Sequence, residues 1–152
     1  MTKSEILENL SGSFSLLEKD LNALPEELFT KCMGGKARTV ADIIFEIIEV
    51  NDHVGATIRG EVPPAWPYEG WVTAPSDFGT KDVVIAGILA SRDRFVGGVE
   101  AMSEEELNGT VQTERGESTR ASRCRFIALH NWYHSGQLNF IQSLAGDDKW
   151  NW

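Results

Sequence analysis

Cysteine and long apolar runs are scarce in this sequence, and each shortage argues against a class of protein. The 152 residues include two cysteines, Cys32 and Cys124, and three histidines. The start of the chain has no export signal, which predicts a cytoplasmic protein. In that compartment two cysteines are expected to be free thiols and not a disulfide. Apolar runs are short and interrupted by charged or amide side chains, so no predicted helix crosses a membrane.

Positive charge is the next shortage, because 14 lysines and arginines face 23 aspartates and glutamates and the formal net charge is -9. The average field of such a chain repels phosphate backbones and anionic lipids. We therefore expect a small-molecule substrate, and neither nucleic acid nor a membrane as a partner. One local cluster is basic, and it either forms an anion site or pairs with surface carboxylates. This cluster comprises Arg115, Arg120, Arg123 and Arg125.

Proline is confined mostly to one stretch, since four of the five prolines lie between Gly60 and Gly79. Elsewhere apolar residues recur at steps of three and four, which predicts amphipathic helices. Four such helices are expected, over about residues 2–24, 39–59, 80–102 and 119–145. Together they predict an all-α four-helix bundle formed by a single domain over residues 1–152.

Polar residues mark where two of these helices begin. Thr2 and Glu5 have the spacing of a capping box, and Thr39 is placed to cap the second helix. Between the third and fourth helices, residues 110–113 are compatible with a short extended segment, but their pattern does not predict a sheet.

The proline-rich stretch of about twenty residues can connect opposite ends of two ~30 Å helices, so the second and third helices are expected to run parallel. Its aromatic residues include Trp66, Tyr68 and Trp71, which are too many for a solvated linker. We expect them to pack either over the mouth of a cleft or over one end of the bundle.

Two of the three histidines, His130 and His134, lie four residues apart in the last predicted helix, so both point to one face. Such a pair presents two imidazole nitrogens to one point about 2 Å from each, which suits a divalent ion such as zinc, nickel or iron. His53 is expected to face inward from the second helix and to complete a three-histidine site with open positions for substrate. The alternative is that all three are buried neutral rings, each hydrogen-bonded within the core.

No base accompanies the histidines in the local sequence, because Asn131 stands where the zincin motif requires glutamate. Glu46 and Glu49, on the same helix as His53, are the candidates for a catalytic base. The alternative for both is a solvated helix face or the support of a metal ligand. Gln137 shares the histidine face, and its amide either orients a ligand or bridges to a neighbouring helix.

Two segments of the chain resemble the DinB/YfiT-like family of metalloenzymes. The run His130-Asn-Trp-Tyr-His134-Ser-Gly-Gln137 resembles the His-x-x-x-His-x-Gly-Gln signature of the family's last helix. Thr39-Val-Ala-Asp-Ile-Ile, which leads to Asn51-Asp-His53, resembles its second-helix segment with a single inward histidine. The similarity extends over nearly the whole chain in the length and order of the predicted elements.

The resemblance implies a bundle of up-down-down-up topology, a homodimer, and a divalent metal on His53, His130 and His134. It also implies a metal-dependent transferase or isomerase that uses a low-molecular-weight thiol such as bacillithiol or mycothiol, and we favour zinc or nickel as the metal. A thiol on the metal would be held as thiolate, which is a nucleophile for an electrophilic substrate. The residues expected to support a ligand or contact substrate are Gln137, Asn51, Trp71 and Arg123.

Two rival functions stay open at this point. Hydrolysis by a metal-bound hydroxide would use the same site, but it requires a base or orienting carboxylate such as Glu49. A noncatalytic metal-binding or small-molecule-binding dimer would use the surplus tryptophans at its interface. Turnover in the absence of added thiol would favour the hydrolase.

Overall fold

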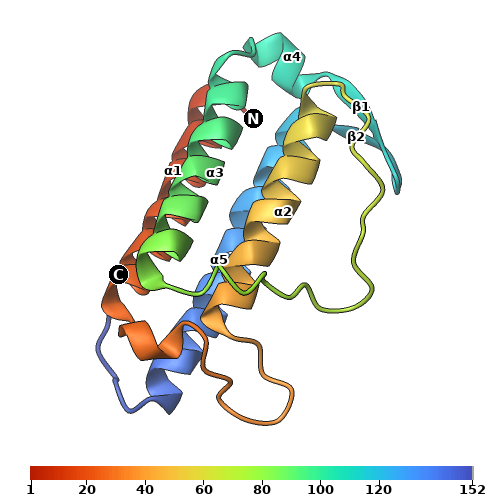
Figure 1. Ribbon diagram of the computed structural model, residues 1–152. Helices are drawn as coiled ribbons and strands as arrows, with labels where there is room; N and C mark the ends of the chain where they lie inside the picture. Colours follow the sequence, from red (N-terminus) through yellow and green to blue (C-terminus); the bar gives the residue numbers. More distant parts are fainter. Residues whose placement is uncertain (152) are drawn as a thin grey trace.

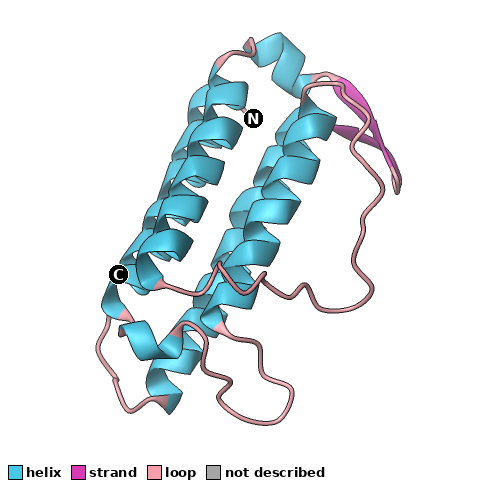
Figure 2. Cartoon of the chain, in the orientation of Figure 1, coloured by secondary structure: helices cyan, strands magenta, loops and turns pink. Residues whose placement is uncertain are grey.

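A computed structural model describes residues 1–151, which are mostly helical (Figure 2). The four long helices pack together as a bundle, so the prediction of an all-α four-helix bundle is confirmed. Among the described residues, no helix is long and apolar enough to cross a membrane. In chain order the elements are α1 (Lys3–Ala23), the 3-10 turn η1 (Glu26–Leu28), α2 (Val40–Ile58), α3 (Lys81–Glu100), α4 (Glu104–Asn108), β1 (Thr110–Thr113), β2 (Gly116–Thr119) and α5 (Arg120–Leu144).

The ends of the long helices lie within two residues of the predicted ones, because local signals determine them. The capping box of α1 is formed by Thr2 and Glu5, each of which bonds the backbone N–H of the other. Thr39 caps α2 in the same way together with Asp42. Pro25, which has no N–H to donate, directly follows the residue that caps the end of α1.

Contacts between helices give their directions. Asn131 of α5 donates to Ser13 of α1, and further along both helices Asn139 donates to Asp20, so α1 and α5 are parallel. Figure 1 shows α2 and α3 both running the opposite way, from the lower end of the bundle to the upper end. Residues 59–80 form the crossover between these two parallel helices, and they contain no regular secondary structure.

A short β-hairpin between α4 and α5 is a feature that the sequence did not predict. Strands β1 and β2 pair antiparallel, with Thr110 opposite Thr119 and Thr113 opposite Gly116. Each strand has four residues and only Val111 is buried, so there is no apolar alternation to reveal it. Gly116 has a φ of 104°, a conformation that favours glycine, and it follows the turn between the strands.

The two cysteines lie in different environments, and both are free thiols. Cys32 is exposed, whereas Cys124 of α5 is completely buried in the core. Burial raises the pKa of the Cys124 thiol to about 12. This side chain is therefore an uncharged core group at neutral pH and not a nucleophile or metal ligand.

Candidate metal centre

Three donor groups from two antiparallel helices meet halfway along the bundle. His130 and His134 of α5 point their Nε2 atoms at each other, 3.0 Å apart. Oε1 of Glu46, on α2, lies 3.5 Å from the first of these nitrogens and 3.4 Å from the second. No other group of three or more such donors within 4.8 Å of one another is present in the described part of the chain.

The spacing of these three atoms fits a divalent ion. Donors of a tetrahedral zinc site lie about 2 Å from the ion and therefore roughly 3.3 Å from one another. The three observed separations, 3.0, 3.4 and 3.5 Å, bracket that value. Two imidazoles and one carboxylate are also a donor set that zinc and other divalent transition metals accept, and it leaves coordination positions open.

Gln137 determines which nitrogen of His134 faces the centre. Its amide nitrogen donates to the hydroxyl of Tyr133, so its Oε1 is free to accept from Nδ1 of His134 at 2.8 Å. With the proton held on Nδ1, the neutral ring presents a lone pair on Nε2 to the centre. His134 is only 1% exposed, and the ring of Tyr133 packs against it at a centroid distance of 5.0 Å.

The carboxylate of Glu46 is kept ionised by the groups around it. Burial alone raises its pKa, but the contacts with the imidazoles of His130 and His134 and the charge of Arg38 outweigh burial, so the pKa lies well below its usual range. Arg38 binds the outer oxygen, Oε2, at 2.6 Å. Its own side chain is 8% exposed, and its guanidinium lies 5.0 Å from the ring centroid of Trp71.

The environment of His130 keeps its imidazole neutral. Burial lowers its pKa more than the nearby carboxylate of Glu46 raises it. Its Nδ1 atom is buried and has no hydrogen-bond partner, while the ring of Phe126 stacks on the imidazole at a centroid distance of 5.6 Å. A neutral ring with an available lone pair is the form in which histidine binds a metal.

His53, the third histidine proposed from the sequence, lies elsewhere on α2. Its Nε2 atom is 4.0 Å from Oε1 of Glu114 in the hairpin, and its ring meets the edge of Trp66. The side chain is 19% exposed and lines a cavity, so it neither faces open solvent nor belongs to the group of Glu46, His130 and His134.

The relative register of α2 and α5 explains this difference. Arg120, at the start of α5, donates to the carbonyl of Ile58, at the end of α2, and the two helices run in opposite directions from there. Counting twelve residues back from Ile58 along α2 and twelve forward from Arg120 along α5 places Glu46 level with the residue midway between His130 and His134. Counting five residues from the same two starting points places His53 level with residue 125, which lies more than one helical turn before His130.

The remaining predicted site residues are not brought together. Asn51 is buried and donates to Ser91, so it joins α2 to α3. Glu49 accepts a hydrogen bond from the hydroxyl of Tyr68 in the crossover. Trp71 covers Arg38 while remaining 63% exposed, and Arg123 faces the cavity that His53 lines.

That cavity, of about 790 Å³, lies between the end of α2, the start of α5 and the hairpin. The first part of the crossover supplies Val62, Pro63 and Trp66 to its wall, so one of the three aromatic residues expected to pack lies at a cavity, whereas Trp71 is largely exposed. Phe126 connects the cavity to the three-donor group, because it lines the cavity and stacks on His130.

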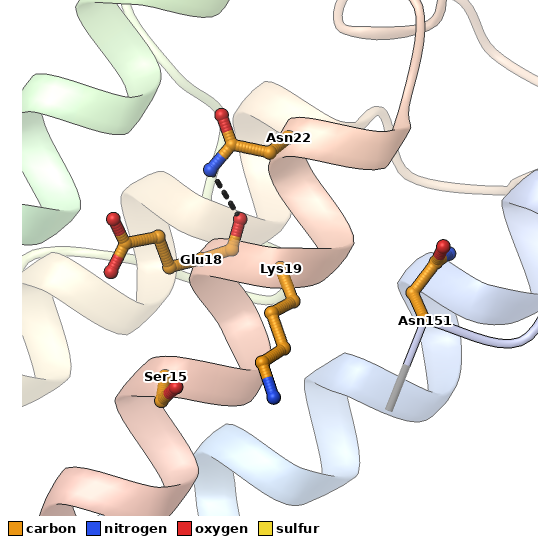
Figure 3. A pocket seen from close by; sticks show the side chains of 5 residues that line it. All are labelled: Ser15, Glu18, Lys19, Asn22 and Asn151. Atoms are coloured by element: carbon orange, nitrogen blue, oxygen red, sulfur yellow. Dashed lines mark hydrogen bonds between the residues drawn. The ribbon is translucent and has the colours of Figure 1, made fainter.

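A second hollow, of about 390 Å³, lies on the outer side of α1 (Figure 3). Its titratable lining residues are Glu18 and Lys19, and Asn22 donates to the backbone carbonyl of Glu18. It holds no histidine or cysteine, so its chemistry does not rival that of the group on α2 and α5.

A family model described as the DinB superfamily matches residues 9–138, a range that includes both histidines of the last-helix signature. The match confirms the resemblance seen in the sequence motifs. No curated protein matches the chain.

Three solved structures show the same fold. YfiT from Bacillus subtilis, described as a probable metal-dependent hydrolase with an unusual four-helix bundle topology, has a TM-score of 0.73 and 12% identity, over 95% of this chain and 87% of that one. The colibactin self-resistance protein ClbS has a TM-score of 0.72 and 22% identity, over 93% and 96%. A mutant of the mycothiol-dependent maleylpyruvate isomerase has a TM-score of 0.67 and 16% identity, over 91% and 61%.

The exclusion of nucleic acid from the charge balance is wrong. The ClbS structure is a complex with double-stranded DNA, so a protein of this fold does contact nucleic acid. The physical reason is that net charge is an average over the whole surface, whereas binding of a phosphate backbone depends on the local potential. The net negative charge of this chain therefore does not exclude nucleic acid, because its arginines form a local cluster.

Proposed function

Because the chain belongs to the DinB superfamily, we propose that it is a divalent-metal-dependent enzyme whose ion is held by His130 and His134 together with a donor from α2. The observation that carries the proposal is the convergence of three donor atoms at separations of 3.0 to 3.5 Å. Zinc or nickel suits a site of this composition.

Two residues of α2 are candidates for the third donor. Glu46 already lies beside the two imidazoles, and its ionised state suits a ligand. His53, the donor predicted from the sequence, lines the neighbouring cavity about two helical turns further along α2. If His53 is the ligand, Glu46 is left as a carboxylate base next to the site.

For the reaction we propose S-transfer or isomerisation with a low-molecular-weight thiol, and metal-dependent hydrolysis is the second candidate. A divalent ion at these donors supplies Lewis-acid chemistry and favours the ionised form of a nearby thiol or water. Gln137 orients the imidazole of His134, and Arg38 holds the carboxylate of Glu46 in place. A position for Glu46 as base favours hydrolysis, since water must lose a proton to attack.

Metal binding tests the proposal directly. Protein stripped with a chelator should bind about one zinc or nickel ion per chain in a calorimetric titration, and His134→Ala should abolish that binding. If Glu46 is the third donor, Glu46→Gln should weaken binding strongly, whereas Glu49→Gln, a matched change on the same helix, should leave it unchanged because Glu49 bonds Tyr68 instead. The effect of His53→Ala identifies the α2 donor.

Stoichiometric binding that survives His134→Ala would refute the proposal. The reaction type is tested on the metal-loaded protein with and without added thiol. Strict dependence on thiol excludes hydrolysis, and turnover without thiol favours it. The cytoplasmic location and the organisation of residues 1–152 as a single domain stay predictions.

A further inference from the structure

The cavity beside the metal centre has an unusual charge for this protein. Three arginines line it, from the hairpin and the start of α5, in a chain whose net charge is -9. In the described residues none of the three forms an ion pair with a carboxylate. The three are Arg115, Arg120 and Arg123.

The acidic residues of the wall do not neutralise these arginines. Glu61 is bound by Arg59, with contacts of 2.8 and 2.9 Å to its two oxygens. Glu114 is 71% exposed and lies opposite His53. The arginine side of the cavity therefore keeps its positive charge.

Arg123 is the residue placed to use that charge. Its Nε atom is buried, lacks a hydrogen-bond partner and belongs to a side chain that lines the cavity. Its guanidinium lies 4.9 Å from the ring centroid of Phe126, so one face is covered by an aromatic ring. Burial and, as the smaller cause, the charge of Arg115 lower the pKa of Arg123.

Arg120 plays a different part in the same wall. Its guanidinium is fixed by the backbone carbonyls of Ile58, Glu106 and Thr110. These contacts hold the cation at the junction of α2, α4 and the hairpin without cancelling its charge. It supports the shape and potential of the cavity, while Arg123 retains donors for a ligand.

Part of the remaining wall is apolar, beside polar residues of α2 and the hairpin. Val50 and Val54 of α2, Val62 and Trp66 of the crossover, and Phe126 of α5 all line the cavity. An aromatic or aliphatic body fits such a surface, and a carboxylate or phosphate group fits a planar guanidinium. The stack of Arg123, Phe126 and His130 leads from the cation to the metal centre.

We propose that this cavity binds an organic anion, with its carboxylate or phosphate group on Arg123 and its apolar body against Phe126 and Trp66. Placing this anion as the enzyme's substrate rests on the proposed metal-dependent function. The anion site itself is independent of the metal, so it can be tested on metal-free protein.

The first test compares two fluorescent probes of the same aromatic type, the anionic anilinonaphthalene sulfonate and the neutral phenylnaphthylamine. Arg123→Gln should weaken binding of the sulfonate about tenfold, the loss expected for one charge-assisted contact. Binding of the neutral probe should stay within about twofold of wild type. Arg92→Gln, which removes an arginine on α3 outside the cavity, should change neither.

The proposal is overturned if Arg123→Gln leaves sulfonate binding unchanged, if it weakens both probes equally, or if Arg92→Gln has the same effect. A competition on the wild-type protein needs no variant. Benzoate and phenyl phosphate should displace the sulfonate, with the stronger competitor indicating the head group, and benzyl alcohol should not. Displacement by a short DNA duplex but by neither small anion would also overturn the proposal, in favour of nucleic acid.

A separate zinc titration of Arg123→Gln distinguishes failure of the anion-site proposal from failure of the proposed metal-dependent function. Loss of anion binding at Arg123 with intact metal binding is expected, because the arginine is not among the metal donors. If anion binding is absent while His134→Ala still abolishes metal binding, only the anion site is wrong.

Discussion

Removal of the Gln137 amide tests whether the orientation of His134 matters for the metal centre. In Gln137→Leu the side chain keeps a similar size but loses the oxygen that accepts from Nδ1 of His134 at 2.8 Å. The imidazole is then free to carry its proton on Nε2, where the lone pair is needed. Loss of such a supporting hydrogen bond costs about 10- to 100-fold in metal affinity, or about 1.4 to 2.7 kcal/mol.

The same substitution has a separate effect on the metal-free protein. Nδ1 of His134 is left without a partner in a side chain that is 1% exposed. An orphaned buried donor costs about 1 to 3 kcal/mol of unfolding free energy. Urea unfolding of metal-free protein measures this cost, and competition with a chromophoric chelator measures the zinc affinity, so the two effects can be separated.

Gln137→Glu and Gln112→Leu are the matched comparisons. The glutamate keeps an acceptor for His134 and, being charged, makes the imidazole a better ligand, so zinc affinity should equal or exceed that of wild type. Gln112 is exposed on β1 and its replacement should have no effect on zinc. Wild-type affinity in Gln137→Leu, or an equal loss in Gln137→Glu, would refute the orienting role.

Three further predictions concern stability and reactivity. Asp20→Ala should lower the unfolding free energy by about 2 to 4 kcal/mol in urea, because Asp20 is buried and accepts from Ser135 at 2.5 Å and Asn139 at 3.1 Å. Burial raises the pKa of Asp20 despite these bonds, so between its unfolded value near 3.8 and the folded value the native state binds more protons. The stability of wild type relative to Asp20→Asn should therefore increase as the pH falls through this window, measured by urea unfolding across the pH range. A disulfide reagent should label Cys32 at once and Cys124 only on unfolding, as mass spectrometry of the labelled peptides will show.

The helices could be predicted from the sequence because each depends on neighbouring residues. The spacing of apolar residues gave the buried faces, and Thr2 and Thr39 marked the first turns of α1 and α2. The hairpin could not be predicted in this way, since its two strands are short, mostly polar and paired only with each other. In the fold, β1 contacts α2 and β2 contacts α5, and the local sequence pattern of the strands reveals neither contact.

The candidate site was predictable only in part. The pair His130 and His134 could be found from a spacing of four, which is a property of one helix. Which residue of α2 lies beside this pair depends on the offset between two helices that are far apart in the sequence. That offset is set by contacts such as the one between Arg120 and Ile58. Sequence reasoning therefore named Glu46 only as a candidate base, and ligation by His53 stays a prediction that the metal titration tests.

The arginine cluster shows why local arrangement outweighs composition in this protein. Net charge led to the exclusion of nucleic acid, yet the cavity wall carries three arginines without ion pairs. The guanidinium of Arg120 donates to three backbone carbonyls, and these contacts account for its position. Among the described residues the buried Nε of Arg123 has no such partner, and the partly buried side chain lines the cavity. An anionic ligand in the adjacent cavity is the simplest source of that missing partner.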